Sequence, residues 1–493
     1  MIARASTPTV SPATVSKRLV LFTCMVAMAA GNMSSFPIAV IMPTIAQTFQ
    51  VEIPTAQWAM TGHFVALAAT MLPIGSAGDI LGRTQIFKAG FLILIASLLA
   101  VPLSSSLEIF VFLRVLHGVG AGMVMVSAPA IVSAMVPPSE RGRALALTFL
   151  GGFIATGVGQ PLFGAMVQAF PWFSPFLLVT IPSALAFALA FKLPVVKNPN
   201  PRPFDAIGAA LLMFGCGGLV IGAGHGQEEG WALQHTLEHV VPLLLASVAA
   251  VVTYVFHAQR VTYPILPLAF FRSVTFTTGA ITNSLAHMTM LMVGFLMPFY
   301  LQNALGYQPL QVAMFLVPMS VAMNVMAVPS GWIYDKKGSR WPCSIALFMG
   351  AALLFSYQAL TVDSGPFDVM IRMVVAGVVL GLFVTPNVSA ILGAVPPEHY
   401  SLAAGFEQTT RNIGHSVGAV LSSVVATFVL GSVTAKATPE TYVEVLHGAG
   451  LVAGLLMSAG ALIALMRDDT RGGRKVVARE PEVVVREPAA QTA

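Results

Sequence analysis

Apolar runs long enough to cross a lipid bilayer recur along almost the whole chain, and this feature limits its fold more than any other. A membrane-spanning helix needs about 20 mainly apolar residues. Of the 493 residues, 56% are hydrophobic and 9% are charged, whereas soluble proteins are about 25% charged. We place spanning helices near residues 18–42, 55–77, 86–103, 109–135, 142–168, 174–193, 206–224, 240–257, 274–302, 310–332, 342–362, 369–395, 402–430 and 446–466. The sequence thus predicts an all-α membrane protein with 14 transmembrane helices.

The basic residues support this count because they alternate between the two sides. With the N-terminus in the cytoplasm, 21 of the 25 Lys and Arg fall in inner segments and one, Lys436, falls in an outer loop. Arg114, Arg372 and Arg411 lie within spans or at their edges. Positive residues are retained on the cytoplasmic side of membranes, so both termini are predicted to be cytoplasmic. The first apolar run is too long for the core of a signal peptide, and we expect it to remain as a span.

The sequence also argues against several classes of protein. Its basic residues form no stripe of the kind that binds nucleic acid. Cys24, Cys216 and Cys343 lie far apart and form neither a disulfide framework nor a zinc pattern. There is no Walker loop, no nucleophile elbow and no HExxH motif. We therefore expect no enzymatic activity, no catalytic residue, no cofactor and no metal. The expected partners are a small-molecule substrate, protons and the lipid bilayer.

The sequence repeats itself across its two halves. Residues 75–83 read GSAGDILGR and residues 331–340 read GWIYDKKGSR. A shift of 259 residues pairs Gly118 with Gly377, Gly122 with Gly381 and Gly159 with Gly418. Parallel halves with a site between them are a transporter architecture. The repeat predicts a cytoplasmic segment at 1–17, a six-helix bundle at 18–203, two inserted helices at 204–268, a second six-helix bundle at 269–466 and a disordered cytoplasmic tail at 467–493.

These motifs resemble those of the major facilitator superfamily, and most of all its fourteen-span drug:proton antiporters, which are multidrug efflux proteins. GSAGDILGR resembles the signature loop between helices 2 and 3, and LRVLHGVGAG at 113–122 resembles the helix 4 motif. GVGQPLFGA at 157–165 resembles the antiporter motif of helix 5, carried here by Gly157, Gly159, Pro161 and Gly164. The resemblance implies the major facilitator fold and a location in the cell membrane. It also implies that the proton gradient drives efflux, and that this efflux confers antibiotic resistance. We expect the protein to act as a monomer.

The resemblance also implies a gate at each copy of the signature loop. The gate residues are Gly75, Asp79, Gly82 and Arg83, repeated as Gly331, Asp335, Gly338 and Arg340. In the family, the carboxylate docks on the N-terminus of a helix in the other half, where free N–H groups favour an anion. Asp79 would dock on the helix that begins near residue 402, and Asp335 on the helix that begins near residue 142. The alternative is that each Asp only caps a turn and anchors its loop.

Glu407 is the one acidic residue that we place inside a span, four residues before Arg411. Ionisable groups within a bilayer are costly unless they are paired, hydrated or functional. One interpretation is an ion pair along one helix that neutralises itself. The other makes Glu407 the proton carrier, kept ionised by Arg411 until substrate or a conformational change separates them. Arg114 is either an arginine that extends to the outer interface or a buried charge that acts on a neighbouring acid or on substrate.

Polar residues within the spans are candidates for the wall of a substrate cavity, with Met and Phe as its adaptable apolar part. These candidates are Asn32, Ser34, His63, Gln160, Asn283, His287, Asn324, Asn387 and Asn412. A single histidine in a membrane helix is more often a hydrogen-bonded packing residue than a proton carrier, so both interpretations stay open. The glycines and the proline of helix 5 can likewise serve close packing alone.

Three functions remain as hypotheses. The first is a secondary transporter that exports small amphipathic drugs or toxic compounds in exchange for protons. The second is a transporter of a neutral or anionic metabolite, favoured because Arg114 and Arg411 outnumber Glu407 and because Ser34 stands where helix 1 of the antiporter branch usually has an Asp. The third is a membrane receptor or scaffold without transport, which would not need two gate motifs.

Overall fold

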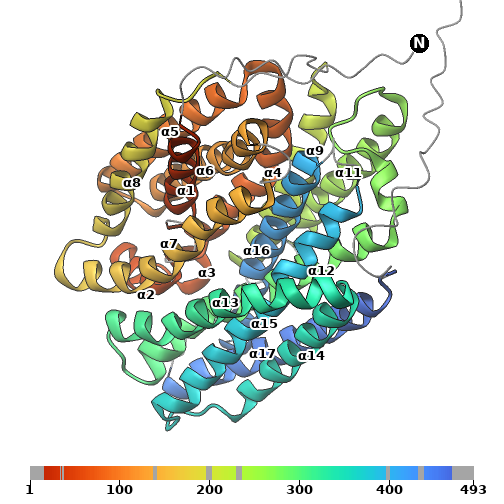
Figure 1. Ribbon diagram of the computed structural model, residues 1–493. Coiled ribbons are helices and arrows are strands. Elements are labelled where there is room, and N and C mark those ends of the chain that lie inside the picture. Colours follow the sequence, from red (N-terminus) through yellow and green to blue (C-terminus); the bar gives the residue numbers. More distant parts are fainter. Residues whose placement is uncertain are drawn as a thin grey trace, which may run out of the picture.

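The computed structural model describes residues 16–33, 35, 38–136, 141–195, 203–228, 236–395, 400–430 and 438–468. Within these ranges the regular structure is helical (Figure 1), which confirms the predicted all-α class. In this part of the chain, 11 helices are long and apolar enough to cross a membrane, and Ser174–Ala190 and Ala206–Leu219 are shorter apolar helices. The predicted N-terminal segment up to residue 15 and the tail after residue 468 lie outside the described residues.

Two predicted spans differ from the observed helices. The run at 18–42 forms two helices, α1 (Lys17–Met33) and α2 (Ile38–Phe49). Pro37 stands between them in the sequence, and a proline disfavours helical backbone at the residue before it. The run at 446–466 starts earlier than predicted, because α17 (Pro439–Leu465) has Thr438 at its N-cap and Pro439 at its first position. Both differences come from local signals at helix ends that a hydropathy count does not register.

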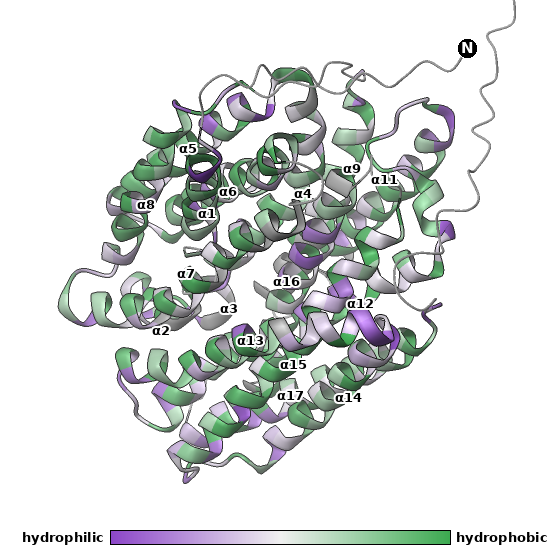
Figure 2. Cartoon of the chain, in the orientation of Figure 1, coloured by the Kyte–Doolittle hydropathy of each residue, from purple (hydrophilic) through white to green (hydrophobic). Residues whose placement is uncertain are grey.

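The outer surface of the molecule is apolar. Leu103, Phe367 and Phe428 are 77%, 76% and 73% exposed, and Figure 2 shows hydrophobic residues over most of the outer helices. Apolar patches of this extent are unfavourable in water, whereas lipid tails accept them. Polar colour gathers at helix ends and on α16 (Tyr400–Leu430), which runs through the middle of the view. The exposed surface is therefore that of a membrane protein whose polar side chains lie inside.

Two sets of helices pack in the same way. The N-terminal helices are α1, α2, α3 (Ile53–Ala56), α4 (Trp58–Leu81), α5 (Arg83–Ala100), α6 (Leu107–Met135), α7 (Arg141–Ala169) and α8 (Ser174–Ala190). The C-terminal helices are α12 (Val274–Phe299), α13 (Pro309–Lys337), α14 (Arg340–Ser356), α15 (Pro366–Gly393), α16 and α17. α1 packs on α7 as α12 packs on α16, α4 packs on α6 as α13 packs on α15, and α5 packs on α8 as α14 packs on α17. The repeat in the sequence is thus a repeat of helix pairs.

Glycines matched by the repeat lie at the closest of these contacts. A Cβ atom on Gly118 of α6 would lie 2.6 Å from the carbonyl oxygen of His63 in α4. A Cβ atom on Gly377 of α15 would collide with the carbonyl oxygen of Met319 in α13, and Gly381 meets the next turn of α13. The helices approach this closely because these residues have no side chain.

Two further helices, α9 (Ala206–Glu228) and α11 (Val241–Arg260), connect the two sets along the chain and pack on each other. α9 also contacts α4 and α16. Asp205 joins them, because its Oδ1 accepts a hydrogen bond from the N–H of Gly208 at 2.8 Å and lies 2.7 Å from Nε2 of His257. The pair therefore lies beside the junction of the N-terminal and C-terminal helices.

The N-terminal and C-terminal helices meet mainly along α4 with α16 and α7 with α13. In Figure 1, α16 runs between the two sets. A Cβ atom on Gly164 of α7 would lie 2.8 Å from the carbonyl oxygen of Pro309, and one on Gly157 would lie 3.3 Å from Cβ of Ser320. Gly157 and Gly164 of the helix 5 motif thus form part of the interface between the sets.

Candidate functional site

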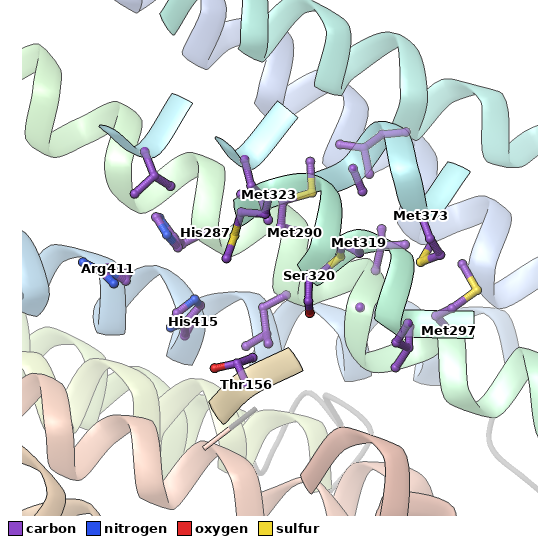
Figure 3. Close-up of a pocket in the computed structure, with 18 of the residues that line it drawn as sticks. Thr156, His287, Met290, Met297, Met319, Ser320, Met323, Met373, Arg411 and His415 are labelled. Carbon is purple, nitrogen blue, oxygen red and sulfur yellow. The ribbon is translucent and has the colours of Figure 1, made fainter. Parts of the chain in front are cut away.

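A cavity opens beside this interface, chiefly between α12, α13, α15 and α16, with Asn32 of α1 and Thr156 of α7 on its other wall (Figure 3). It holds about 1260 Å³ of space, including the part that is open to solvent. Its flexible apolar residues are Met290, Met297, Met319, Met323 and Met373. Its polar residues are Asn32, Thr156, His287, Ser320, Tyr357, Arg411 and His415. The wall is mostly apolar with a few polar groups, which is the usual composition of a site for small organic molecules.

The ion pair of Glu407 and Arg411 lies at the edge of the cavity. Nη2 of Arg411 lies 2.8 Å from both carboxylate oxygens, and its Nε lies 3.2 Å from Oε1. The Glu407 side chain is 3% exposed, whereas that of Arg411 is 19% exposed and lines the cavity. The predicted pair within one helix is therefore confirmed, and its positive end faces the cavity.

Two asparagines of neighbouring helices support this pair, and a third lies on α16 itself. Nδ2 of Asn283 in α12 donates to the carbonyl oxygen of Glu407 at 2.9 Å and lies 3.3 Å from its Oε1. Asn387 in α15 is next in line, with its Nδ2 3.4 Å from Oδ1 of Asn283. Asn412 donates to the carbonyl of Gln408 and contacts Met71 of α4. None of these three candidates is among the residues that line the cavity.

Arg467 completes this polar network, and the sequence analysis did not identify it. We assigned it to the cytoplasmic tail, yet it is 1% exposed. Its guanidinium donates to Oδ1 of Asn387 at 2.5 Å, to Oγ1 of Thr282 at 2.6 Å and to Sγ of Cys343 at 3.0 Å. Because it directly follows the apolar run of α17, hydropathy alone reads it as the first residue outside the bilayer. Its position shows that the C-terminal bundle has a cation buried at one end.

Two histidines of the C-terminal helices contact each other beside the cavity. The rings of His287 and His415 meet edge to face with centroids 5.1 Å apart, and His415 lies 4.9 Å from the ring of Phe64 in α4. His287 and His415 both line the cavity. Nδ1 of His287 lies 2.9 Å from the carbonyl of Asn283, so this ring is oriented by the same residue that supports Glu407.

A second polar cluster lies within the N-terminal helices. Nη1 of Arg114 is 2.8 Å from Nδ1 of His117, and its Nε donates to the carbonyl of Ala59 at 3.0 Å. The rings of His117 and His63 stack with centroids 4.9 Å apart, and Nε2 of His63 is 2.8 Å from Oγ of Ser35. Arg114 is 1% exposed. It is therefore a buried charge rather than an arginine that extends to the interface.

The remaining cavity candidates fall in different places. Asn32 lines the cavity and donates to the carbonyl of Met28 at 2.9 Å. Asn324 donates to the carbonyl of Ser320 at 2.8 Å and is not among the lining residues. Ser34 and the side chain of Gln160 lie outside the described residues. Thr156 and Ser320 were missed, because single hydroxyl groups are too common in membrane helices to mark a site.

Both copies of the signature loop turn at glycine. Gly82, after α4, has φ of 103° and Gly338, after α13, has φ of 74°, and glycine adopts such backbone without steric cost. Arg83 donates to the carbonyl of Ala130 at 3.1 Å. Asp335 is exposed, and the side chain of Asp79 lies outside the described residues. The two copies thus share a glycine turn, and the docking of the two carboxylates stays a prediction.

Other members of these motifs lie within helix contacts. Gly75 of α4 lies near Val126 of α6, and Gly331 of α13 lies near Thr385 of α15. Arg340 lies over the ring of Trp341, 5.7 Å from its centroid. In the helix 5 motif, Gly159 is buried and Pro161 lies inside α7. The motif residues thus serve packing and turns in this structure, and their part in gating stays a prediction.

The chain was compared with known proteins. The family model of the Major Facilitator Superfamily matches residues 20–419. The tetracenomycin C resistance and export protein of Streptomyces glaucescens is 28% identical over 400 residues, which cover 80% of this chain and 73% of that protein. The riboflavin transporter RibZ of Clostridioides difficile (strain 630) is 27% identical over 386 residues, which cover 77% of this chain and 82% of that protein.

Among solved structures, an inward-facing, unoccupied bacterial homologue of the human lysosomal transporter Spinster superposes with a TM-score of 0.65. The superposition covers 91% of this chain and 96% of that chain at 14% sequence identity, and so shows a shared fold. Because the family model covers most of the sequence and the fold agrees with it, the chain belongs to the Major Facilitator Superfamily and is a multi-pass membrane transporter, not an enzyme.

Proposed function

We propose that the protein is a secondary active transporter that exports small amphipathic compounds across the cell membrane by alternating access, coupled to protons. The observation that carries this proposal is the methionine-rich cavity with a buried carboxylate–arginine pair at its edge. The cavity supplies room for a substrate, and Glu407 supplies a group that can gain and lose a proton.

The composition of the cavity supports a range of amphipathic substrates. Methionine side chains are unbranched and polarisable, so they adapt to ligands of different shape. The polar groups on the wall, such as Asn32, Thr156 and Ser320, are few and come from both sets of helices. A compound bound there would contact both sets at once, which is what alternating access requires. The name of the tetracenomycin C export protein supports drug export for this chain as well.

The arrangement in the membrane is part of the same proposal. We infer fourteen spans. α1 and α2 together form one of them, α8 and α9 form one each, and the longer helices form the other eleven. We further infer six-helix bundles at 18–203 and 269–466, helices inserted at 204–268, both termini in the cytoplasm, and a monomer. Asp79 and Asp335 would hold the cytoplasmic gate. The paired packing of the N-terminal and C-terminal helices supports this division.

A second candidate is transport of a neutral or anionic metabolite, including uptake. The observation in its favour is that the charged group on the cavity wall is Arg411, with Glu407 behind it. The similarity to the riboflavin transporter RibZ, whose name gives a metabolite as its substrate, also supports this second candidate. A receptor or scaffold without transport is the weakest candidate, because the chain belongs to a family of transporters.

Flux into or out of proteoliposomes tests the proposal. Vesicles that hold the purified protein and an amphipathic fluorescent dye are given a pH gradient, and dye movement is followed with time. We expect gradient-dependent movement for the wild type, and a loss of about tenfold or more for Glu407→Gln if it carries the proton, since proton-transfer groups typically contribute 100-fold or more. Arg372→Gln is the matched control, because Arg372 bonds to carbonyl groups of Asp368 and Ser356 and is not among the residues that line the cavity. Equal flux for wild type and Glu407→Gln would remove Glu407 from the coupling step.

A further inference from the structure

The charge that faces the cavity decides which compounds it can hold, and that charge is positive. Arg411 lines the cavity, whereas the carboxylate of Glu407 is buried behind it at 3% exposure. None of the described residues that line the cavity is Asp or Glu. A cationic compound in the cavity would therefore meet a guanidinium and no carboxylate, whereas an anionic compound would meet an opposite charge.

Arg411 has donors left for such an anion. A guanidinium carries five N–H groups. Glu407 is held by Nε and Nη2 of Arg411, and within the described part of the chain no hydrogen bond of its Nη1 is found. The two N–H groups on Nη1 can thus donate to an oxygen of a carboxylate, a phenolate or a sulfonate while Glu407 stays in place. The binding geometry of guanidinium for such oxyanions is favourable.

A bound anion changes the situation of Glu407. Two negative groups would then share one guanidinium, and the side chain of the inner one, Glu407, is 3% exposed. When a second anion shares the cation that pairs with a buried carboxylate, the attraction between that cation and the carboxylate weakens. The carboxylate is then neutralised most readily by taking a proton. Binding linkage is reciprocal, so protonation of Glu407 would also strengthen the binding of the anion. Compound and proton would therefore occupy the protein together.

The surroundings of the pair offer two other places for a proton, both of them histidines. His287 of α12 and His415 of α16 line the same cavity and contact each other. On the side of α15, Asn387 connects the pair to the buried cation of Arg467. On the side of α4, Phe64 contacts His415 and Met71 contacts Asn412. His63 is the residue before Phe64 in α4. Nδ2 of Asn283 lies 3.3 Å from Oε1 of Glu407 and can donate to this oxygen whether the carboxyl group is ionised or protonated.

We propose that the cavity takes amphipathic compounds that carry an acidic oxygen, that this oxygen binds Arg411, and that each compound binds together with one proton on Glu407. This inference rests on the proposed transport function and selects its second candidate, because a solute and a proton that bind together move in the same direction. An exchange of drug for protons would require the opposite, namely that binding of one expels the other.

Calorimetric titration of the purified protein tests this without any transport. Naphthoate and naphthylmethylamine share an aromatic body and carry opposite charge at neutral pH, so they serve as matched probes. We expect naphthoate to bind at least about tenfold more tightly. Titrations in two buffers of different ionisation enthalpy at one pH give the number of protons taken up. We expect uptake approaching about one proton per naphthoate for the wild type.

Three variants assign the proton and the anion site. Glu407→Gln should keep naphthoate binding but take up no proton. Glu407→Gln combined with Arg411→Gln should lose the preference for naphthoate, and this double variant avoids a buried carboxylate without its cation. Arg372→Gln should behave as the wild type. Proton uptake that persists in Glu407→Gln would indicate that the histidines take the proton, and would overturn its assignment to Glu407.

The outcomes also separate this inference from the transport function. Tighter binding of naphthylmethylamine, or release of protons on binding, would overturn the inference and leave proton-coupled export standing. A protein that binds either probe but moves no compound in proteoliposomes would instead refute the transport function.

Discussion

The two sets of helices repeat the same packing but hold different chemistry. In the N-terminal helices, Arg114 is bonded to His117 and to a backbone carbonyl, and this cluster is not part of the cavity wall. In the C-terminal helices, Arg411 is bonded to Glu407, and its free edge faces the cavity. Ten of the twelve methionine and polar residues named on the wall come from the C-terminal helices and the turn after α14, and two come from the N-terminal set.

This difference separates the frame from the chemistry. Close helix pairs built on Gly118 and Gly377 are common to both sets, so they serve the fold that the two share. The carboxylate, the exposed guanidinium and the adaptable wall occur together in the C-terminal set. We therefore expect variants in the shared frame to cost similar stability in either set, and variants of the charged site to act through the C-terminal set.

The largest expected effect comes from breaking the ion pair on one side. Arg411→Gln leaves the buried Glu407 without its cation, and loss of one partner from a buried pair typically costs about 3–5 kcal/mol. Thermal or chemical unfolding in detergent measures it. Adding Glu407→Gln should restore much of this stability, since neither charge then remains. A double variant as unstable as Arg411→Gln would show that the pair does not determine the effect.

Removing the cation at the other end of the C-terminal network should cost less. Arg467→Gln removes hydrogen bonds to Asn387, Thr282 and Cys343. Hydrogen bonds to charged groups each contribute about 1.5–3 kcal/mol to stability. Part of this loss is offset because the variant no longer buries a charge. We expect a net loss of about 2 kcal/mol in the free energy of unfolding. Arg372→Gln, at a more exposed helix end, is the comparison. Equal losses would mean that the burial of Arg467 adds nothing.

The shared frame can be tested with one change in each set. Gly118→Ala and Gly377→Ala both force a methyl group against a backbone carbonyl of the next helix, and overpacking costs about 1–3 kcal/mol. Gly294→Ala is the control, because nothing lies within 4 Å of the position its Cβ would take. We expect similar losses for the first two and no loss for the third. A loss confined to one set would break the equivalence of the frames.

The smallest effect on stability should come from methionine exchange. Leucine has nearly the volume of methionine, and such swaps usually cost less than about 1.5 kcal/mol. Met319→Leu changes the cavity wall, whereas Met125→Leu changes a buried contact near Gly31 in the N-terminal set. Dye flux with a panel of compounds should show altered preference for Met319→Leu alone. Equal profiles for both variants would argue against the methionine wall as the substrate surface.

The sequence predicts the helices well, because apolar length is a strong signal. The predicted span at 274–302 and the observed α12 begin at the same residue. The pair of Glu407 and Arg411 is predictable as well, because residues four apart share a helix face. The contact of His287 with His415 was not predicted, because it joins two helices far apart in the sequence. The burial of Arg467 was not predicted either, because hydropathy does not show whether a charge at a helix end packs against the bundle.

The helix contacts at glycine have a consequence for how this protein can change its substrates over evolution. Where helices touch through Gly377 and Gly381, nearly every replacement collides with a neighbouring backbone, so these positions resist mutation. Met319, Met323 and Met373 stand on the same two helices, yet they line the cavity. New preferences can therefore arise one side chain at a time without disturbing the frame. Such a transporter can acquire a new cargo by point mutation long before its architecture has to change.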